Sequence, residues 1–432
     1  MMRRVYLDNN ATTPVLPDVL EAMRPYFAER FGNASSIHSH GQQTRAAVER
    51  ARESVAALVG ARASEVVFTS GGTEADNLAI FGVVGGIGHR SPVTDEREFV
   101  ATSERPPVTG HQSCHIITST IEHHAVLNAC RHLEPNGCDV TYVPVDANGV
   151  VDPADVRRAL RPSTKLISIM FANNETGMVQ PVAEIGAIAR EADVYFHTDA
   201  VQAAGKIPVR VDEMGCDLLT ISAHKLHGPQ GVGALYVRKG TALSAMIYGG
   251  RHERSRRAGT ENVPGIVGLG KAAELALAGL ARGDDLKIAE MRDRLEAELL
   301  GIEACGVNGA GTHPSQSTRR MGHPRVPNTT NIYFEGIDGE ALVIALDLKG
   351  LAVSTGAACS SGAIEPSHVL MAMGMPAERA RASIRFSLGK MNSAEDVEFA
   401  LAMVPETVGR LRELSPIWKE SRVSSDELRA IT

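Results

Sequence analysis

The lysine at position 225 stands in a setting that favours covalent chemistry. It follows the apolar run 218–221 and lies within Ser222-Ala223-His224-Lys225-Leu226-His227-Gly228-Pro229, with a histidine on either side. Lysine amines attack carbonyl groups when they are desolvated or lie near other positive groups. Most lysines are ordinary solvated side chains, so Lys225 alone is a weak indication. Partners elsewhere in the sequence must decide its role.

A carboxylate is the first such partner, and Asp199 supplies it at the end of another apolar run, 194–198. In enzymes that use pyridoxal 5'-phosphate (PLP), a lysine anchors the cofactor and an aspartate keeps the pyridine nitrogen protonated. The ring then accepts electrons from a substrate carbanion. The alternative for Asp199 is an N-cap before Ala200, since aspartates often begin helices. Asp199 and Lys225 together predict PLP chemistry.

A glycine turn, Thr69-Ser70-Gly71-Gly72-Thr73-Glu74-Ala75, is the third feature. It follows the strand-like residues 65–68 and precedes an apolar-periodic segment. Free backbone N–H groups at a helix N-terminus, together with a hydroxyl, can hold a phosphate there. The turn matches neither the dinucleotide fingerprint nor the Walker lysine loop. An ordinary turn is the alternative, and the phosphate interpretation depends on Asp199 and Lys225.

With these features in place, nearly the whole chain resembles cysteine desulfurases of the NifS/IscS type, in the class V group of fold-type I PLP enzymes. The segments that carry the resemblance are residues 6–14, 32–38, 69–78, 121–126, 172–177, 194–202, 222–229, 257–262, 354–362 and 382–389. They occur in the same order as in the family, which argues against a chance match.

The resemblance implies a role for each matching residue around the PLP ring. Lys225 is expected to hold the cofactor covalently, Asp199 to pair with the pyridinium nitrogen and His123 to stack on the ring. Gln202 and Asn174 are expected near the ring hydroxyl and the bound substrate. Singly, each has a structural alternative, because such residues also serve turns, caps and cores.

The phosphate group has its own implied ligands. They are the amide of Gly72 and the side chains of Thr73, Ser222 and His224. By the same resemblance, Thr260 reaches the phosphate bound to the second subunit of a homodimer. The basic cluster 251–257 is then expected beside the dimeric site, and we do not interpret it as a nucleic-acid surface.

Cys359 decides which reaction is expected. It lies in Ser354-Thr355-Gly356-Ala357-Ala358-Cys359-Ser360-Ser361-Gly362, a composition that suits a surface loop rather than a core. The resemblance implies that its thiolate takes the sulfur of L-cysteine as a persulfide and leaves L-alanine. His123 is the candidate acid/base for the thiol proton. The sulfur then passes to an iron–sulfur scaffold or another acceptor protein.

Arg385 is the second residue that bears on the substrate. It stands between apolar residues in Ser383-Ile384-Arg385-Phe386-Ser387, and a guanidinium buried there needs an anionic partner. The planar guanidinium can form two parallel hydrogen bonds to a carboxylate. The resemblance implies that its partner is the α-carboxylate of the substrate amino acid. An Arg–Asp brace within the small domain is the structural alternative.

These residues must be positioned by two kinds of domain. Alternating strand-like and helical runs up to about residue 264 predict an α/β large PLP-binding domain, residues 21–264, with a mostly parallel mixed sheet flanked by helices. A long amphipathic stretch at 271–300, a strand at 330–334 and helices at 340–348 and from 394 predict a smaller α+β domain, residues 265–432. By resemblance, residues 1–20 join the second domain.

Composition limits the other possibilities. The chain has 432 residues, 43% of them apolar, and a net charge of −7, which argues against nucleic acid as a partner. Its 6 cysteines include no Cys-x-x-Cys pair, so no metal site is expected. Cys130 and Cys138 flank a turn and could approach each other, but the absence of a signal segment favours the reducing cytoplasm. We find no apolar run suited to a membrane span.

We therefore expect a PLP-dependent, homodimeric cysteine desulfurase that supplies sulfur for iron–sulfur cluster assembly. Both a nitrogen-fixation and a housekeeping role fit. A class V aminotransferase would need Lys225 and Asp199 but no loop cysteine, and a selenocysteine lyase would share the whole site. A non-catalytic protein of this fold would be expected to have lost Lys225 or Cys359.

Two segments, residues 85–113 and 306–327, depart from the family pattern, and their composition predicts enlarged surface loops.

Overall fold

The computed structural model describes residues 3–85, 114–309, 325–356, 365–416 and 418–419. Within them, seven strands form one sheet in the order β2-β8-β7-β6-β5-β3-β4. Their bounds are β2 (Val66–Thr69), β3 (Cys114–Ser119), β4 (Cys138–Val143), β5 (Thr164–Ser168), β6 (Tyr195–Asp199), β7 (Leu218–Ser222) and β8 (Gly233–Val237). Only β8 runs antiparallel to its neighbours, so the sheet is mixed and mostly parallel, as predicted.

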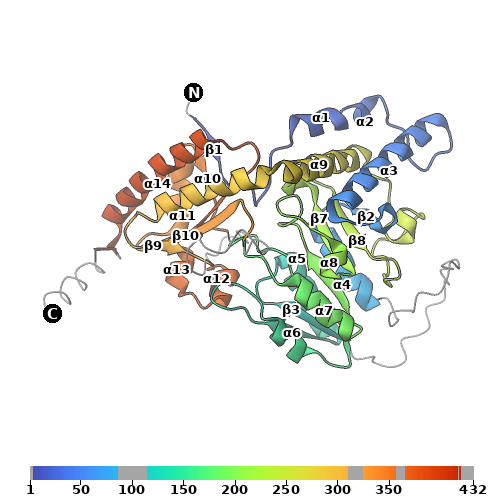
Figure 1. Ribbon diagram of the computed structural model, residues 1–432, viewed down its shortest axis with the longest axis horizontal. Coiled ribbons are helices and arrows are strands. Elements are labelled where there is room, and N and C mark those ends of the chain that lie inside the picture. Colours follow the sequence, from blue (N-terminus) through green and yellow to red (C-terminus); the bar gives the residue numbers. More distant parts are fainter. Residues whose placement is uncertain (1–2, 86–113, 310–324, 357–364, 417, 420–432) are drawn as a thin grey trace.

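Helices cover both faces of this sheet because successive side chains of each strand point to opposite sides. Val66, Phe68 and Ile117 lie in one core with residues of α3 (Ser39–Val59), α6 (Pro153–Ala159), α7 (Val182–Glu191) and α9 (Val263–Arg282). Val67 and Ile116 lie in a second core with residues of α4 (Gly72–Gly85) and α5 (His124–Leu133). Both faces are therefore buried, which explains the continuous apolar runs of the strands (Figure 1).

A separate core surrounds the second part of the fold. The antiparallel strands β12 (Ser383–Ser387), β10 (Thr329–Phe334) and β9 (Cys305–Val307) form one small sheet. Packed on it are α10 (Asp284–Leu299), α11 (Gly339–Leu348) and α14 (Ala394–Leu414). The N-terminal strand β1 (Val5–Tyr6) pairs in parallel with β11 (Leu351–Ala352), so the start of the chain joins this part of the molecule (Figure 1).

The amphipathic stretch expected at 271–300 is two helices rather than one. Gly283, with φ 75°, takes the left-handed conformation that ends α9, and α10 begins at the next residue. Helix α9 is long and apolar enough to span a membrane by length and composition, but it carries Lys271 and Glu274 and so is not the uncharged run that the expectation excluded. Its side chains Ile266, Leu269 and Ala273 are instead buried in the first core.

Two further expectations need correction. Reduced cysteines were expected, but Cys114 and Cys138 lie opposite each other on the parallel strands β3 and β4 and are joined by a disulfide, while Cys130 is a free, buried thiol. The predicted surface loop 306–327 begins inside strand β9, and Val326 near its end is fully buried. Most of that segment, and residues 86–113 of the other predicted loop, lie outside the described residues.

Candidate active site

The candidate site lies at the edge of the large sheet where the parallel strands end. Strand β6 ends at Asp199 and β7 at Ser222, and the short 3₁₀ helix Ala223–Lys225 follows directly. Helices α4 and α5 begin at the same edge, after β2 and β3. Ligand sites of α/β proteins form outside the carboxyl ends of their strands, and the topology brings the predicted residues together there.

Lys225 is held by the N-terminal segment of the chain. Its Nζ donates to the carbonyl oxygen of Asn10 at 2.5 Å and to that of Ala11 at 2.6 Å. Burial, and then the positive charge of Arg385, lower the pKa of Lys225 to about 8. A substantial fraction of the amine is therefore neutral in mildly alkaline solution, as a nucleophile toward carbonyls requires.

Asp199 is 6% exposed and accepts a hydrogen bond from the backbone N–H of Val201 at 2.9 Å. This contact is the one that an N-cap would make, but the chain continues as turns and no helix begins at Ala200. Burial raises the pKa of Asp199 to about 6, against the opposing effects of the Val201 hydrogen bond and the Lys225 charge. Among the residues that the structure describes, no basic side chain bonds to this buried carboxylate, which suits a cationic ring nitrogen.

His123 is the N-cap of α5, where its Nδ1 accepts from the backbone N–H of Ala125 at 3.1 Å. Although the ring remains accessible to solvent, desolvation by the surrounding chain and the charge of Lys225 lower the pKa of His123 to about 4. The ring is thus neutral near pH 7, with its proton on Nε2. A neutral imidazole can stack on a ring and also exchange a proton.

The predicted phosphate ligands divide into two groups. A Cβ added to Gly72 would lie 3.5 Å from the Cβ of Ser222, so the first residue of α4 packs against the end of β7. Thr73 is exposed in the first turn of the same helix. These residues form a helix N-terminus with two hydroxyl groups, which fits an anion.

The other two ligands are placed differently. The Nδ1 of His224 lies 3.1 Å from Thr12 Oγ1, and burial lowers the pKa of His224 to about 4, so it offers no positive charge. Thr260 is exposed on a loop that is tied to α4, because Arg257 pairs with Glu74 at 2.9 Å.

Arg385, Asn174 and Gln202 converge on the N-terminal segment. Arg385 is 4% exposed; its Nη2 lies 2.7 Å from Asp8 Oδ1, and its Nη1 donates to the carbonyl oxygen of Asn174 at 2.9 Å. The Arg–Asp brace considered as an alternative is therefore present. It does not use the whole guanidinium, since Nε is buried with no hydrogen-bond partner in the part of the chain that the structure describes. Gln202 Nε2 donates to the carbonyl oxygen of Asn10 at 3.0 Å.

Cys359 lies outside the described residues, but both ends of its segment are placed. Ser354 forms a backbone bridge with Arg385, and a Cβ on Gly356 would lie 3.2 Å from Glu175 Oε2. On the far side, Ser367 donates to the same oxygen at 2.5 Å. The segment that carries Cys359 therefore leaves the described fold beside Arg385 and Glu175 and re-enters it beside Glu175.

Two residues at this site were not predicted to have a role there. Asn10 was noted only as part of the matching segment 6–14, yet it contacts Lys225, Gln202 and Lys206. Lys206 was not singled out, and its spacing of four residues from Gln202 was no signal, because this spacing indicates contact on a helix and the chain here forms turns. Lys206 also lines a cavity that it shares with Lys225.

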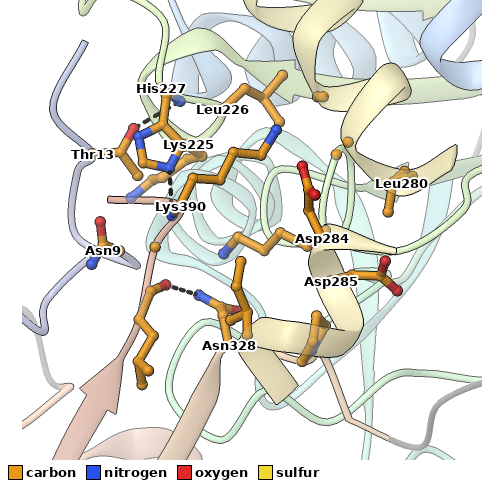
Figure 2. Close-up of a pocket in the computed structure, with 18 residues that line it drawn as sticks. Asn9, Thr13, Lys225, Leu226, His227, Leu280, Asp284, Asp285, Asn328 and Lys390 are labelled. Atoms are coloured by element: carbon orange, nitrogen blue, oxygen red, sulfur yellow. Dashed lines mark hydrogen bonds between the residues drawn. The ribbon is translucent and has the colours of Figure 1, made fainter. Parts of the chain in front are cut away.

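That cavity extends from Lys225 toward α9 and α10. His227 lies between Thr13 and Lys390 at its wall, and Asp284 faces it from the start of α10 (Figure 2). Asp199, His123 and Gly72 are not among its lining residues. The cavity is thus a neighbour of the candidate site rather than the site. Within the described ranges, no group of three or more His, Cys, Asp or Glu side chains could hold a metal ion.

Comparison with known proteins places this geometry in a family. The model of the family "Aminotransferase class-V" matches residues 5–103 and 93–399. A protein of Dictyoglomus turgidum named cysteine desulfurase IscS is 47% identical over 425 residues, which cover 98% of this chain and 99% of that protein. A solved NifS-like protein has a TM-score of 0.81 and 36% identity, covering 94% of this chain and 100% of its own. The structure of SspA in complex with cysteine has a TM-score of 0.73 and 34% identity, covering 90% and 100%.

Proposed function

Since the chain belongs to the class-V aminotransferase family and is an enzyme of its cysteine desulfurase branch, we propose that it uses PLP to transfer the sulfur of L-cysteine to Cys359. The observation that carries the proposal is the arrangement of Lys225, Asp199 and the start of α4 at one edge of the sheet. An amine of lowered pKa, a buried carboxylate and a free helix N-terminus are the three groups that PLP requires.

PLP, when bound, supplies the electron sink for bond breaking at the substrate α-carbon. In our proposal Lys225 holds it covalently, Asp199 pairs with its ring nitrogen and His123 stacks on its face. Gly72, Thr73, Ser222 and His224 bind its phosphate, and Gln202 and Asn174 lie near its ring oxygen and the substrate. The neutral state of His123, which its lowered pKa favours, suits stacking on the ring.

The unpartnered Nε of Arg385 supports its proposed role in substrate binding. A carboxylate oxygen of L-cysteine at this atom would complete the hydrogen bonds of a buried guanidinium whose other nitrogens already contact Asp8 and Asn174. A buried donor without a partner is costly, so the site gains stability when the substrate supplies the acceptor. The cysteine complex of a structural relative agrees with this class of substrate.

Cys359 is proposed to receive the sulfur because its segment begins and ends beside Arg385 and Glu175. Its thiolate forms a bond to the substrate sulfur while the carbon–sulfur bond of L-cysteine breaks. The carbon gains a proton, which His123 as the candidate acid/base would relay from the Cys359 thiol, and L-alanine leaves. The persulfide on Cys359 is then passed to an iron–sulfur scaffold or another acceptor protein, for housekeeping or for nitrogenase.

We further propose that two copies of the chain assemble as a cytoplasmic homodimer, in which Thr260 reaches the phosphate of the second copy. Large apolar side chains that a monomer would leave in water support this: Phe27, Phe31, Ile37 and Tyr248 are 64%, 70%, 91% and 75% exposed.

The division into residues 21–264 and 265–432, with 1–20 joined to the second unit, is also a proposal. The separate cores around the two sheets support two units.

The test compares the PLP-loaded wild type with Cys359→Ser, given L-cysteine and a thiol reductant. We expect the wild type to release alanine and sulfide, and the variant to release neither while keeping its bound PLP. Transamination without sulfide in both proteins would instead favour a class V aminotransferase. A higher rate with selenocysteine than with cysteine would favour a selenocysteine lyase.

A further inference from the structure

Asn10 connects the two parts of the molecule at the candidate site. It is 1% exposed, and its carbonyl oxygen accepts from Lys225 at 2.5 Å and from Gln202 at 3.0 Å. Its side-chain Nδ2 donates to the carbonyl oxygen of Asn174 at 3.0 Å and to Thr329 Oγ1 at 2.8 Å. Asn10 thus bonds to three of the proposed cofactor-binding residues and to a strand of the small sheet.

Lys206 completes this network from the turns that follow β6. Its Nζ donates to Gln202 Oε1 at 2.6 Å and to Asn10 Oδ1 at 2.9 Å. Desolvation, and then the charge of Lys225, lower the pKa of Lys206 well below its ordinary value. The amine therefore lies in the same desolvated environment as the active-site lysine, although its contacts are to amides and not to a carboxylate.

The two side-chain amides can point only one way in this network. The nitrogen of Asn10 faces the carbonyl oxygen of Asn174, and the nitrogen of Gln202 faces that of Asn10. Carbonyl oxygens only accept, so turning either amide over would place two oxygens against each other. The amide oxygens must then face Lys206, whose amine donates to both.

We propose that Lys206 is a positioning residue that fixes the Gln202 amide with its N–H side toward the bound cofactor ring. This inference rests on the proposed function, since it assigns Gln202 to the ring oxygen of PLP. One N–H of Gln202 is used by Asn10, and the second remains for that oxygen. Without Lys206, the Gln202 oxygen loses its donor, and only the contact of the Gln202 nitrogen with the Asn10 carbonyl oxygen still opposes a turn of the amide that would bring an acceptor toward the negatively charged ring oxygen.

The experiment titrates the visible absorption of the lysine-bound cofactor in Lys206→Met, Gln202→Leu and the double variant. A hydrogen bond donated to the ring oxygen draws negative charge from it. When the bond is lost, the oxygen holds the neighbouring proton more tightly, so the pH midpoint rises. We expect both single variants and the double variant to show the same upward shift, because Lys206 acts through Gln202. We also expect them to release PLP about tenfold faster or more.

Two controls separate positioning from general stability. Lys287→Met removes an exposed lysine of α10 and should leave the midpoint and the PLP release rate at their wild-type values. Lys206→Arg keeps a donor at the cavity wall and should restore most of the wild-type midpoint even where Lys206→Met is unstable. A Lys206→Met protein that binds PLP with an unchanged midpoint, or shifts that add in the double variant, would overturn the inference.

Desulfuration is measured alongside. If the wild type binds PLP but makes no alanine from L-cysteine, the proposed function fails while the midpoint shifts still decide the role of Lys206. If desulfuration is confirmed but Lys206→Met and Lys206→Arg both keep the wild-type midpoint, the positioning role fails on its own.

Discussion

The guanidinium of Arg385 reaches Asp8 on the N-terminal segment at 2.7 Å and leaves its own Nε buried without a partner among the described residues. The ion pair fixes the plane of the guanidinium, because Nη1 is held at the same time by the carbonyl oxygen of Asn174 at 2.9 Å. An arginine fixed in this way presents its remaining N–H groups, that of Nε among them, in defined directions. This is the geometry on which the proposed binding of the substrate carboxylate depends.

Replacing Arg385 by lysine should therefore weaken substrate binding more than turnover. Arg385→Lys keeps the charge but not the planar fork, so it cannot bond to Asp8, Asn174 and a carboxylate together. We expect the KM for L-cysteine to rise about 10- to 100-fold, the range set by one or two charge-assisted hydrogen bonds, with a smaller change in kcat. Steady-state alanine formation measures both, with Arg157→Lys on the exposed helix α6 as the control. An unchanged KM would rule out Arg385 as a substrate ligand.

The rate at which the cofactor-free protein captures PLP should rise with pH through about 8. Only the neutral amine attacks the aldehyde, and the pKa of Lys225 is lowered to about 8 by burial and by Arg385. Below that pH the amine is mostly protonated and the rate falls. Stopped-flow absorbance after mixing with PLP measures the rate, and Lys225→Ala should show no covalent capture at any pH. A rate that does not change between about pH 7 and about pH 9 would contradict the assignment.

Asp199 predicts how PLP binding by the cofactor-free protein depends on pH. In that protein burial raises the pKa of Asp199 to about 6, so the carboxylate loses its charge as the pH falls through that value and no anion is left to pair with the ring nitrogen. His123, with a pKa of about 4, does not titrate in this window. We expect the affinity for PLP to fall below about pH 6, and Asp199→Asn to bind PLP about tenfold more weakly or worse with no such fall. Equilibrium titration of the cofactor-free proteins with PLP measures both, and an identical acid decline in Asp199→Asn would assign it to another group.

The residues at the strand ends of this site could be predicted from the sequence. Each follows an apolar run typical of a buried strand, and the carboxyl ends of parallel strands lie at the same edge of a sheet. Asp199 at the end of β6 and Lys225 after β7 are examples. The sequence did not allow the contacts of Asp8 and Asn10 to be predicted, since these join positions hundreds of residues apart. The break at Gly283 was missed because the apolar periodicity of α9 and α10 continues across it. The disulfide was missed because Cys114 meets Cys138 only through strand register.

The buried pair of Arg52 and Glu253 gives a prediction about stability. Arg52 of α3 donates to both carboxylate oxygens of Glu253 at 2.7 and 2.9 Å, and the two side chains are only 5% and 4% exposed. The backbone N–H of Phe68 donates to the same carboxylate at 2.9 Å. Glu253, Arg254 and Ser255 have φ of 44°, 54° and 64°, a left-handed run that non-glycine residues adopt only when their surroundings hold them. The pair therefore restrains the loop that leads to Thr260.

Replacing Arg52 alone should lower the free energy of unfolding more than replacing both Arg52 and Glu253. Arg52→Met leaves a buried carboxylate without its cation, for which we expect a loss of about 3–5 kcal/mol in the apparent free energy of unfolding. Glu253→Gln in the same chain removes the uncompensated charge and should recover part of that loss. Urea unfolding measures both, with Arg45→Met on the exposed face of the same helix as the control. If Arg52→Met unfolds at the same urea concentration as Arg45→Met, the ion pair does not hold the loop, and its left-handed run must be stabilised by other contacts.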